Sequence, residues 1–205
     1  MSTSKCCSLL LHEVTDDPGS TGFQRKTALP YKNTIAEFKS YLNVIAASGF
    51  PVLNIESKNF LKTDGVVLTF DDGGKSAMTA SALVDEYGWK GHFFVTTSRI
   101  GERTFLSKSD IVDLRKRGHI VGSHSHSHPD IFYNLKYDEM LSEWRTSKII
   151  LEDILSEEII SASVPGGDTD EKTIKSAYQV GLKRLFTSDP SYFPKYLEYL
   201  ERKIK

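Results

Sequence analysis

Three of the six histidines in this 205-residue chain fall within five positions of the stretch VGSHSHSHPD, residues 121–130. His124 and His128 are four positions apart, so one helical turn brings them to the same side and leaves His126 pointing elsewhere. An extended strand would place all three on one face, but Pro129 disfavours a longer strand here. Two imidazoles and one carboxylate can hold Zn²⁺ or another divalent ion while leaving a position open for water. Taken alone, the cluster fits a metal site and an exposed polar loop equally well.

An adjacent pair of aspartates follows an apolar stretch in the sequence VVLTFDDGG, residues 66–74. Neighbouring side chains at a strand end point in different directions, so Asp71 and Asp72 need not share one task. One carboxylate can bind a cation, while the other stays ionised beside that charge and acts as a general base. Asp and Gly are also the residues that turns prefer, and Asp-Asp-Gly by itself is more typical of a strand-ending turn.

The elements that must position these residues alternate along the chain. Short apolar runs predict seven strands, at residues 8–14, 51–55, 66–70, 92–97, 119–122, 159–163 and 184–187. The predicted helices are one from the capping box at residues 34–37 to Gly49, and then 76–87, 109–117, 137–155, 171–180 and 196–204. This alternation indicates an α/β fold with a parallel sheet, in a single domain of residues 1–205. Residues 15–32 form the longest segment without predicted structure, so that segment is either functional or mobile.

Polar or glycine-rich segments follow four of the predicted strands. They are His12-Glu13, Asp71-Asp72-Gly73-Gly74, the histidine cluster, and Pro165-Gly166-Gly167-Asp168. Because the loops that follow parallel strands gather at one end of the sheet, we expect these segments to share one rim. His92 and His119 lie at strand starts, at the opposite end of the sheet, and are assigned structural roles.

Composition limits the classes of partner and compartment. Hydrophobic residues make up 39% and charged residues 26% of the chain, as in a folded globular protein. The net charge of −1 gives no reason to expect a nucleic acid as partner. The first residues lack the apolar core of a signal peptide, and no stretch approaches the length of a membrane span, so we expect a cytoplasmic protein. Cys6 and Cys7 are the only cysteines and are interpreted as ordinary thiols.

The aspartate and histidine segments together resemble a known family. TFDDGGKS, residues 69–76, looks like the first motif of the polysaccharide deacetylases, also called the NodB-homology group or carbohydrate esterase family 4. GHIVGSHSHSHPDI, residues 118–131, resembles their second motif, and the two motifs in this order and spacing are far more specific than either alone. The resemblance implies a distorted (β/α)7 barrel similar to a TIM barrel, which agrees with the seven strands predicted from the pattern.

The resemblance also implies roles for individual residues. Asp71 matches the general base of the family, and the metal ligands correspond to Asp72, His124 and His128. His126 matches a position that the family does not use for ligation. The cofactor is then one divalent ion, with zinc expected first and cobalt, nickel or manganese as alternatives.

Two departures from the family pattern concern the base and the acid. The third family motif usually reads Arg-x-Pro, whereas Ser163 stands here in the arginine's place. Either another residue holds Asp71, with Arg184 and Lys183 as candidates, or the base is tuned differently. The last family motif, which carries a histidine, is missing after residue 190, and the sequence LLHE at residues 10–13 resembles it instead. This implies a circularly permuted member in which His12 is the general acid, the alternative being a packed strand-end histidine.

The family resemblance predicts a metal-dependent hydrolase that removes N-acetyl groups from a sugar or polysaccharide, cleaving a carbon–nitrogen bond that is not a peptide bond. Pro165, Gly166 and Gly167 are expected to bind the substrate, an N-acetylated glycan or sugar conjugate. The alternatives are a non-catalytic carbohydrate-binding relative and a hydrolase of another amide or an O-acetyl ester. Four aromatic residues could stack on a sugar, although core packing is their commoner fate; they are Phe105, Phe132, Tyr133 and Tyr192.

Overall fold

Six parallel strands form the main sheet of this computed structural model, which describes residues 6–57 and 60–188. The order in the sheet is β1 (Cys6–Leu11), β4 (Gly65–Phe70), β5 (His92–Val95), β6 (Ile120–Ser123), β7 (Ser161–Ser163) and β8 (Arg184–Phe186). A second, two-stranded parallel sheet consists of β2 (Glu13–Val14) and β3 (Lys32–Asn33). Because every pair of neighbours in the main sheet is parallel, all its strands end at the same rim.

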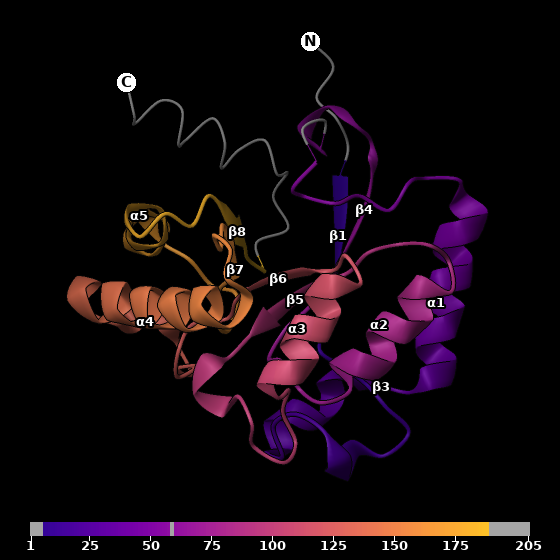
Figure 1. Cartoon of the computed structure of the whole chain (residues 1–205), viewed down its shortest axis with the longest axis horizontal. Helices are drawn as coiled ribbons and strands as arrows, with labels where there is room; N and C mark the ends of the chain where they lie inside the picture. The colour runs from indigo at the N-terminus through magenta and orange to yellow at the C-terminus, as the bar shows by residue number, and fades with distance from the viewer. Residues whose placement is uncertain (1–5, 58–59, 189–205) are drawn as a thin grey trace.

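Helices follow the strands and pack against one another around the sheet (Figure 1). They are α1 (Ile35–Ser48), α2 (Ala77–Asp85), α3 (Lys108–Lys116), α4 (Tyr137–Leu155) and α5 (Glu171–Gln179). Short 3-10 helices are η1 (Pro18–Ser20), η2 (Lys26–Tyr31), η3 (Phe60–Lys62), η4 (Thr97–Arg99) and η5 (Phe132–Asn134). The curled parallel sheet with helices outside it forms a half-barrel of the predicted α/β type, with six strands in the main sheet where seven were expected. The helix expected at residues 196–204 lies outside the described residues.

Local sequence signals account for the helix ends. The predicted capping box at Thr34 forms, since its side chain accepts from the N–H of Glu37 and the Glu37 carboxylate accepts from the N–H of Thr34. Gly49 ends α1 with φ of 73°, a left-handed conformation that glycine adopts without a steric penalty. The longest helix, α4, has the bounds that its periodicity predicts, and it buries Trp144 completely.

Two predicted strands differ from the structure. Residues 51–55 form only an isolated bridge between Val52 and Val66, and not a strand. The reason lies three residues after Val52, where the N–H of Ile55 donates to the imidazole of His92 and not to the backbone of a neighbouring strand. The predicted strand 8–14 is interrupted at His12, which separates β1 from β2.

Buried histidines support the end of the sheet opposite the rim, as predicted. His92 Nδ1 donates to the carbonyl of Leu68 at 3.0 Å, while its Nε2 accepts from Ile55 at 3.2 Å. Burial lowers the pKa of His92 to about 4, so this histidine is neutral at pH 7. His119 Nδ1 accepts from the N–H of Gly91 at 3.1 Å. Both histidines therefore connect strands and loops and take no part in the rim.

In the part of the chain that the structure describes, no helix is both long and apolar enough to cross a bilayer. A cytoplasmic location, expected from the sequence, stays a prediction.

Candidate active site

The candidate site lies at the carboxyl ends of four parallel strands. Asp71 and Asp72 follow β4, His124 follows β6, and Ser163 is the last residue of β7. His12 follows β1, whose last residue pairs with the last residue of β4. These residues line a cavity of about 240 Å³. The sheet register thus brings together residues that are far apart in the sequence, as expected for this rim.

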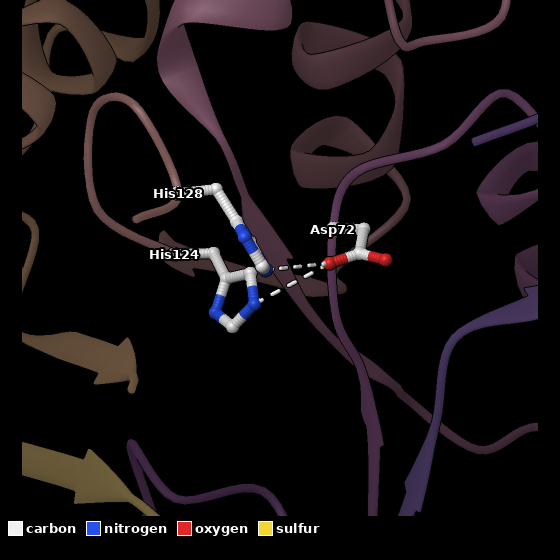
Figure 2. A group of neighbouring side chains, drawn as sticks. All are labelled: Asp72, His124 and His128. Carbon is white, nitrogen blue, oxygen red and sulfur yellow. Dashed lines mark ion pairs between the residues drawn. The ribbon is translucent and has the colours of Figure 1, made fainter. Parts of the chain in front are cut away.

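Asp72, His124 and His128 form a compact cluster with the donor set of a divalent metal site (Figure 2). Asp72 Oδ1 lies 3.4 Å from Nε2 of His124 and 3.3 Å from Nε2 of His128. In a tetrahedral zinc site with bonds of about 2.0–2.1 Å, ligand atoms are about 3.3–3.4 Å apart, which matches these two distances. All three side chains are at least nine-tenths buried, so the cluster is enclosed by protein. The three residues fit one divalent ion.

The tautomer of His124 suits a metal ligand. Its Nδ1 donates to the carbonyl oxygen of Ser163 at 2.9 Å, which leaves the lone pair of Nε2 free to face Asp72. Burial opposes protonation of His124, but the nearby Asp71 and Asp72 carboxylates outweigh it and raise its pKa. Burial also opposes ionisation of Asp72, yet the two imidazoles outweigh it and hold the pKa of Asp72 well below its usual range. A cation at this cluster would therefore compete with a proton for His124.

The loop that carries the histidines is held in an unusual backbone shape. Ser125 and His128 have φ of 60° and 56°, in the left-handed region that non-glycine residues rarely adopt. The Ser125 hydroxyl accepts from the N–H of His128 at 3.1 Å. The Glu143 carboxylate accepts from the N–H groups of His126 and Ser127 at 2.9 and 2.8 Å. Glu143 had no sequence signal, because it lies on α4 and reaches the loop only in the folded chain.

His126 takes a different direction from its two neighbours. Its Nδ1 lies 3.0 Å from the Thr97 hydroxyl, and it is not part of the Asp72, His124 and His128 cluster. This placement is consistent with the family resemblance, in which the position of His126 is not used for ligation.

Asp71 is held by the serine that replaces the family arginine. The Ser163 hydroxyl donates to Asp71 Oδ2 at 2.7 Å, and Asp71 Oδ1 is buried with no hydrogen-bond partner among the described residues. The expectation that Arg184 or Lys183 holds Asp71 is wrong. Arg184 begins β8, at the end of the sheet away from the rim, and Lys183 pairs with Glu158.

His12 lines the same cavity and its ring packs against Tyr31, with centroids 4.8 Å apart. Glu13, the next residue, is buried beneath the site and accepts from the hydroxyls of Thr21 and Ser76 at 2.5 and 2.6 Å. Burial raises the pKa of Glu13, and the two hydroxyls only partly offset this effect. Through its hydrogen bond with Ser76, Glu13 connects β2 to the turn that follows Asp72.

Residues 15–32, which we call the N-terminal strap, supply part of the cavity wall. Phe23, Arg25 and Tyr31 line the cavity, and the sequence pointed to them only through the length of this segment. Tyr31 is 56% exposed beside His12, so its ring is open to a ligand. The strap therefore belongs to the site and is not a remote surface loop.

The other expected binding residues have mixed placements. Gly166 and Gly167 line the cavity with φ of 75° and 76°, whereas Pro165 is buried and does not reach the cavity wall. A β-carbon on Gly167 would lie 1.8 Å from the Ser188 hydroxyl, so only glycine fits there. Among the four aromatic residues, Phe105 and Phe132 belong to the core, Tyr133 lies at the surface, and Tyr192 lies outside the described residues.

A family model described as polysaccharide deacetylase matches residues 58–185, more than half of the chain. The chain belongs to the polysaccharide deacetylase family. Its sequence is similar to that of the peptidoglycan-N-acetylmuramic acid deacetylase PdaC of Bacillus subtilis, with 32% identity over 120 residues. That match covers 57% of this chain and 25% of PdaC.

Solved structures of the same fold cover nearly the whole chain. The polysaccharide deacetylase BC0361 of Bacillus cereus superposes with a TM-score of 0.77 at 23% identity, over 93% of this chain and 60% of that one. The deacetylase PplD of Streptococcus pyogenes gives a TM-score of 0.74 at 19% identity, over 97% and 98% of the two chains. These likenesses confirm the predicted NodB-type barrel. The chain spans about a quarter of PdaC and three fifths of BC0361.

The family match begins after β1 and therefore does not include His12. The circular permutation stays a prediction.

Proposed function

We propose that this deacetylase-family chain is a metal-dependent hydrolase that removes N-acetyl groups from an N-acetylated sugar or polysaccharide. One observation carries the proposal: the Asp72, His124 and His128 cluster, the Asp71 carboxylate and the His12 imidazole line a single cavity. A deacetylase needs a cation site, a base and an acid within reach of one acetamide, and this cavity has a candidate for each role.

Asp72, His124 and His128 would hold the metal, with zinc expected first and cobalt, nickel or manganese as alternatives. When bound, the ion polarises the acetamide carbonyl and lowers the pKa of a water molecule. Asp71 then accepts the proton of the attacking water. The Ser163 hydroxyl already occupies Oδ2, so Oδ1 is the oxygen left to take this proton.

His12 would donate a proton to the departing nitrogen, which is a very poor leaving group as an amide anion. The carbon–nitrogen bond breaks, a new carbon–oxygen bond from water has formed, and the products are acetate and the free amine. Tyr31 packs on one side of the His12 ring and restricts its orientation. Gly166 and Gly167 also line the cavity and have no side chains to fill it, and we expect the sugar to lie there.

The substrate class follows from the relatives and not from the geometry alone. PdaC is described as acting on N-acetylmuramic acid in peptidoglycan, and an N-acetylated sugar of a glycan or sugar conjugate fits the same chemistry here. Ser163 favours one alternative, a non-catalytic carbohydrate-binding relative, because a neutral hydroxyl stabilises the Asp71 carboxylate less than an arginine does. Another amide or an O-acetyl ester would need the same groups.

The test combines metal analysis with acetate release from N-acetylglucosamine oligomers, N-acetylmuramic acid glycans and O-acetylated sugars. D72A and H128A should lose both bound metal and activity, because each change removes one of three ligands. H126A is the matched control, and it should keep both properties because His126 faces Thr97. Full activity in D72A or H128A would refute the proposal, and a metal-replete wild type inert on all substrates would favour the binding module.

A further inference from the structure

We infer that Phe23, on the N-terminal strap, is a positioning residue for the metal ligand His128. The inference rests on the metal site of the proposed function. It explains how His128 keeps a fixed ring orientation without the hydrogen bond that ligand histidines usually make.

The two ligand histidines differ in their second nitrogen. A metal-bound histidine almost always donates its other N–H to a carboxylate, a carbonyl or water, which fixes the ring. His124 follows this rule, since its Nδ1 donates to the carbonyl of Ser163 at 2.9 Å. Nδ1 of His128 is buried and has no hydrogen-bond partner among the described residues. Another interaction must therefore hold the His128 ring.

Two rings contact the imidazole of His128. The Phe23 ring lies 5.0 Å from it between centroids, at an interplanar angle of 55°. The His124 ring lies 4.9 Å away at 64°. Because the backbone of His128 is also fixed, with φ of 56° and its N–H bonded to Ser125, rotation of its ring is opposed mainly by these neighbours. Phe23 is the neighbour that does not itself bind the metal.

Phe23 is in turn fixed by contacts that a loose loop residue would not have. Its ring meets the buried ring of Phe105 edge-on at 5.1 Å. The guanidinium groups of Arg25 and Arg99 lie 5.0 and 5.5 Å from its centroid. Arg25 also pairs at 2.6 Å with Asp130, which is two residues after His128. The strap is therefore joined, beside His128, to the loop of residues 124–130, which we call the metal loop.

The consequence is that the metal site is completed by a segment about a hundred residues away in the sequence. Removing the Phe23 ring frees the His128 imidazole to rotate, while Asp72 and His124 keep their positions. Loss of such a supporting contact typically weakens metal affinity by about 10–100-fold. The change should act on affinity and on ligand geometry, without removing a ligand.

The experiment compares F23A with F23L and with L29A, measuring zinc affinity by chelator competition on the full chain. F23A should bind zinc about 10–100-fold more weakly, and F23L should recover most of the affinity because leucine keeps apolar bulk against the ring. L29A is the matched control on the same strap, because Leu29 is half exposed and should leave the affinity unchanged. The visible spectrum of the cobalt-loaded F23A protein should shift toward that of H128A, which a general loss of stability would not produce.

Wild-type zinc affinity in F23A, or equal weakening in F23A and F23L, would overturn the inference. Should F23A fail to fold, F23V takes its place: because valine is smaller than leucine, F23V should bind zinc more weakly than F23L, and equal affinity in F23V, F23L and wild type would overturn the inference. Metal binding is measured without substrate. An inert wild type with the predicted zinc affinities would therefore refute the proposed function alone, and a wild type that binds no divalent metal would refute both.

Discussion

Two parts of the site are built in different ways. The floor, which consists of Asp71, Asp72, His124 and Ser163, stands at the ends of β4, β6 and β7. Its side chains are buried, and backbone pairing between neighbouring strands sets their positions. The N-terminal strap contributes Phe23, Arg25 and Tyr31 through side-chain contacts with the metal loop and with His12.

The two parts of the site are therefore expected to have different tasks. The floor holds the candidate base and two of the three candidate ligands in a rigid frame, so changes there should remove chemistry or metal outright. The strap holds the third ligand and the candidate acid by packing, so changes there should alter affinity and orientation by smaller factors. Predictions on the two parts can therefore be ranked by size.

Among changes that leave the ligand cluster intact, the largest effect is expected for D71N, in the floor. Asparagine keeps the shape of Asp71 but cannot accept a proton, so acetate release should fall by about 10²–10⁴-fold. Zinc content should stay near the wild-type value, because Asp71 is not in the ligand cluster. Steady-state kinetics and metal analysis on one preparation check both points. Near-wild-type activity in D71N would show that Asp71 is not the general base. Loss of zinc together with activity would place Asp71 among the metal ligands.

A smaller effect is expected at the opposite end of the sheet, where His92 supports the frame of the floor. Its pKa is lowered to about 4 in the folded chain from 6.5, so below pH 6.5 the unfolded chain takes up a proton that the folded chain does not. Stability is therefore full above pH 6.5 and is lost as the pH falls toward 4. Between pH 7 and pH 5 this one group accounts for about 2 kcal/mol.

Urea unfolding of the metal-free protein at pH 7 and pH 5 measures this loss. In H92Q, which has no titrating ring, the decrease between the two pH values should be smaller by about 2 kcal/mol than in wild type. An identical decrease in both proteins would mean that His92 does not stay neutral in the folded chain.

The smallest effect is expected for R25Q, in the strap. The side chains of Arg25 and Asp130 are 45% and 82% exposed, and ion pairs at such exposed positions contribute about 0–1 kcal/mol. Zinc affinity should fall by less than about threefold, and the difference should shrink at high salt. D130N removes the same ion pair but keeps the contact of Arg25 with Phe23, so its effect should be no larger than that of R25Q. A tenfold or larger loss in R25Q alone would show that Arg25 has a direct role that the ion pair does not explain.

The sequence predicted the floor well because short motifs at strand ends encode it. Once residues 66–70 are a parallel strand, Asp71 and Asp72 must reach the rim, and the same holds for His124 after β6. The spacing of His124 and His128 pointed to the cluster that forms, and His126 was separated from it by the resemblance to the family.

The strap could not be predicted, because the contacts that join Phe23 and Arg25 to the rest of the site involve residues 76–105 positions away in the chain. Its sequence has no periodicity, and only its length indicated that the segment is either functional or mobile. The support of Asp71 by Ser163 could not be predicted for another reason: the family motif indicates an arginine at this position, whereas here the serine hydroxyl lies 2.7 Å from Asp71 Oδ2. The prediction of a strand at residues 51–55 was wrong, because an apolar run does not reveal that the N–H of Ile55 donates to a histidine side chain.

The proposed function depends above all on Asp72, His124 and His128 binding one divalent ion together. A crystal structure of the zinc-loaded protein, with the metal located by anomalous scattering, tests it most directly. We expect one zinc held by the carboxylate of Asp72 and by Nε2 of both histidines, with His126 still turned toward Thr97. Zinc bound elsewhere in the chain, or bound here through His126 in place of His128, would contradict it.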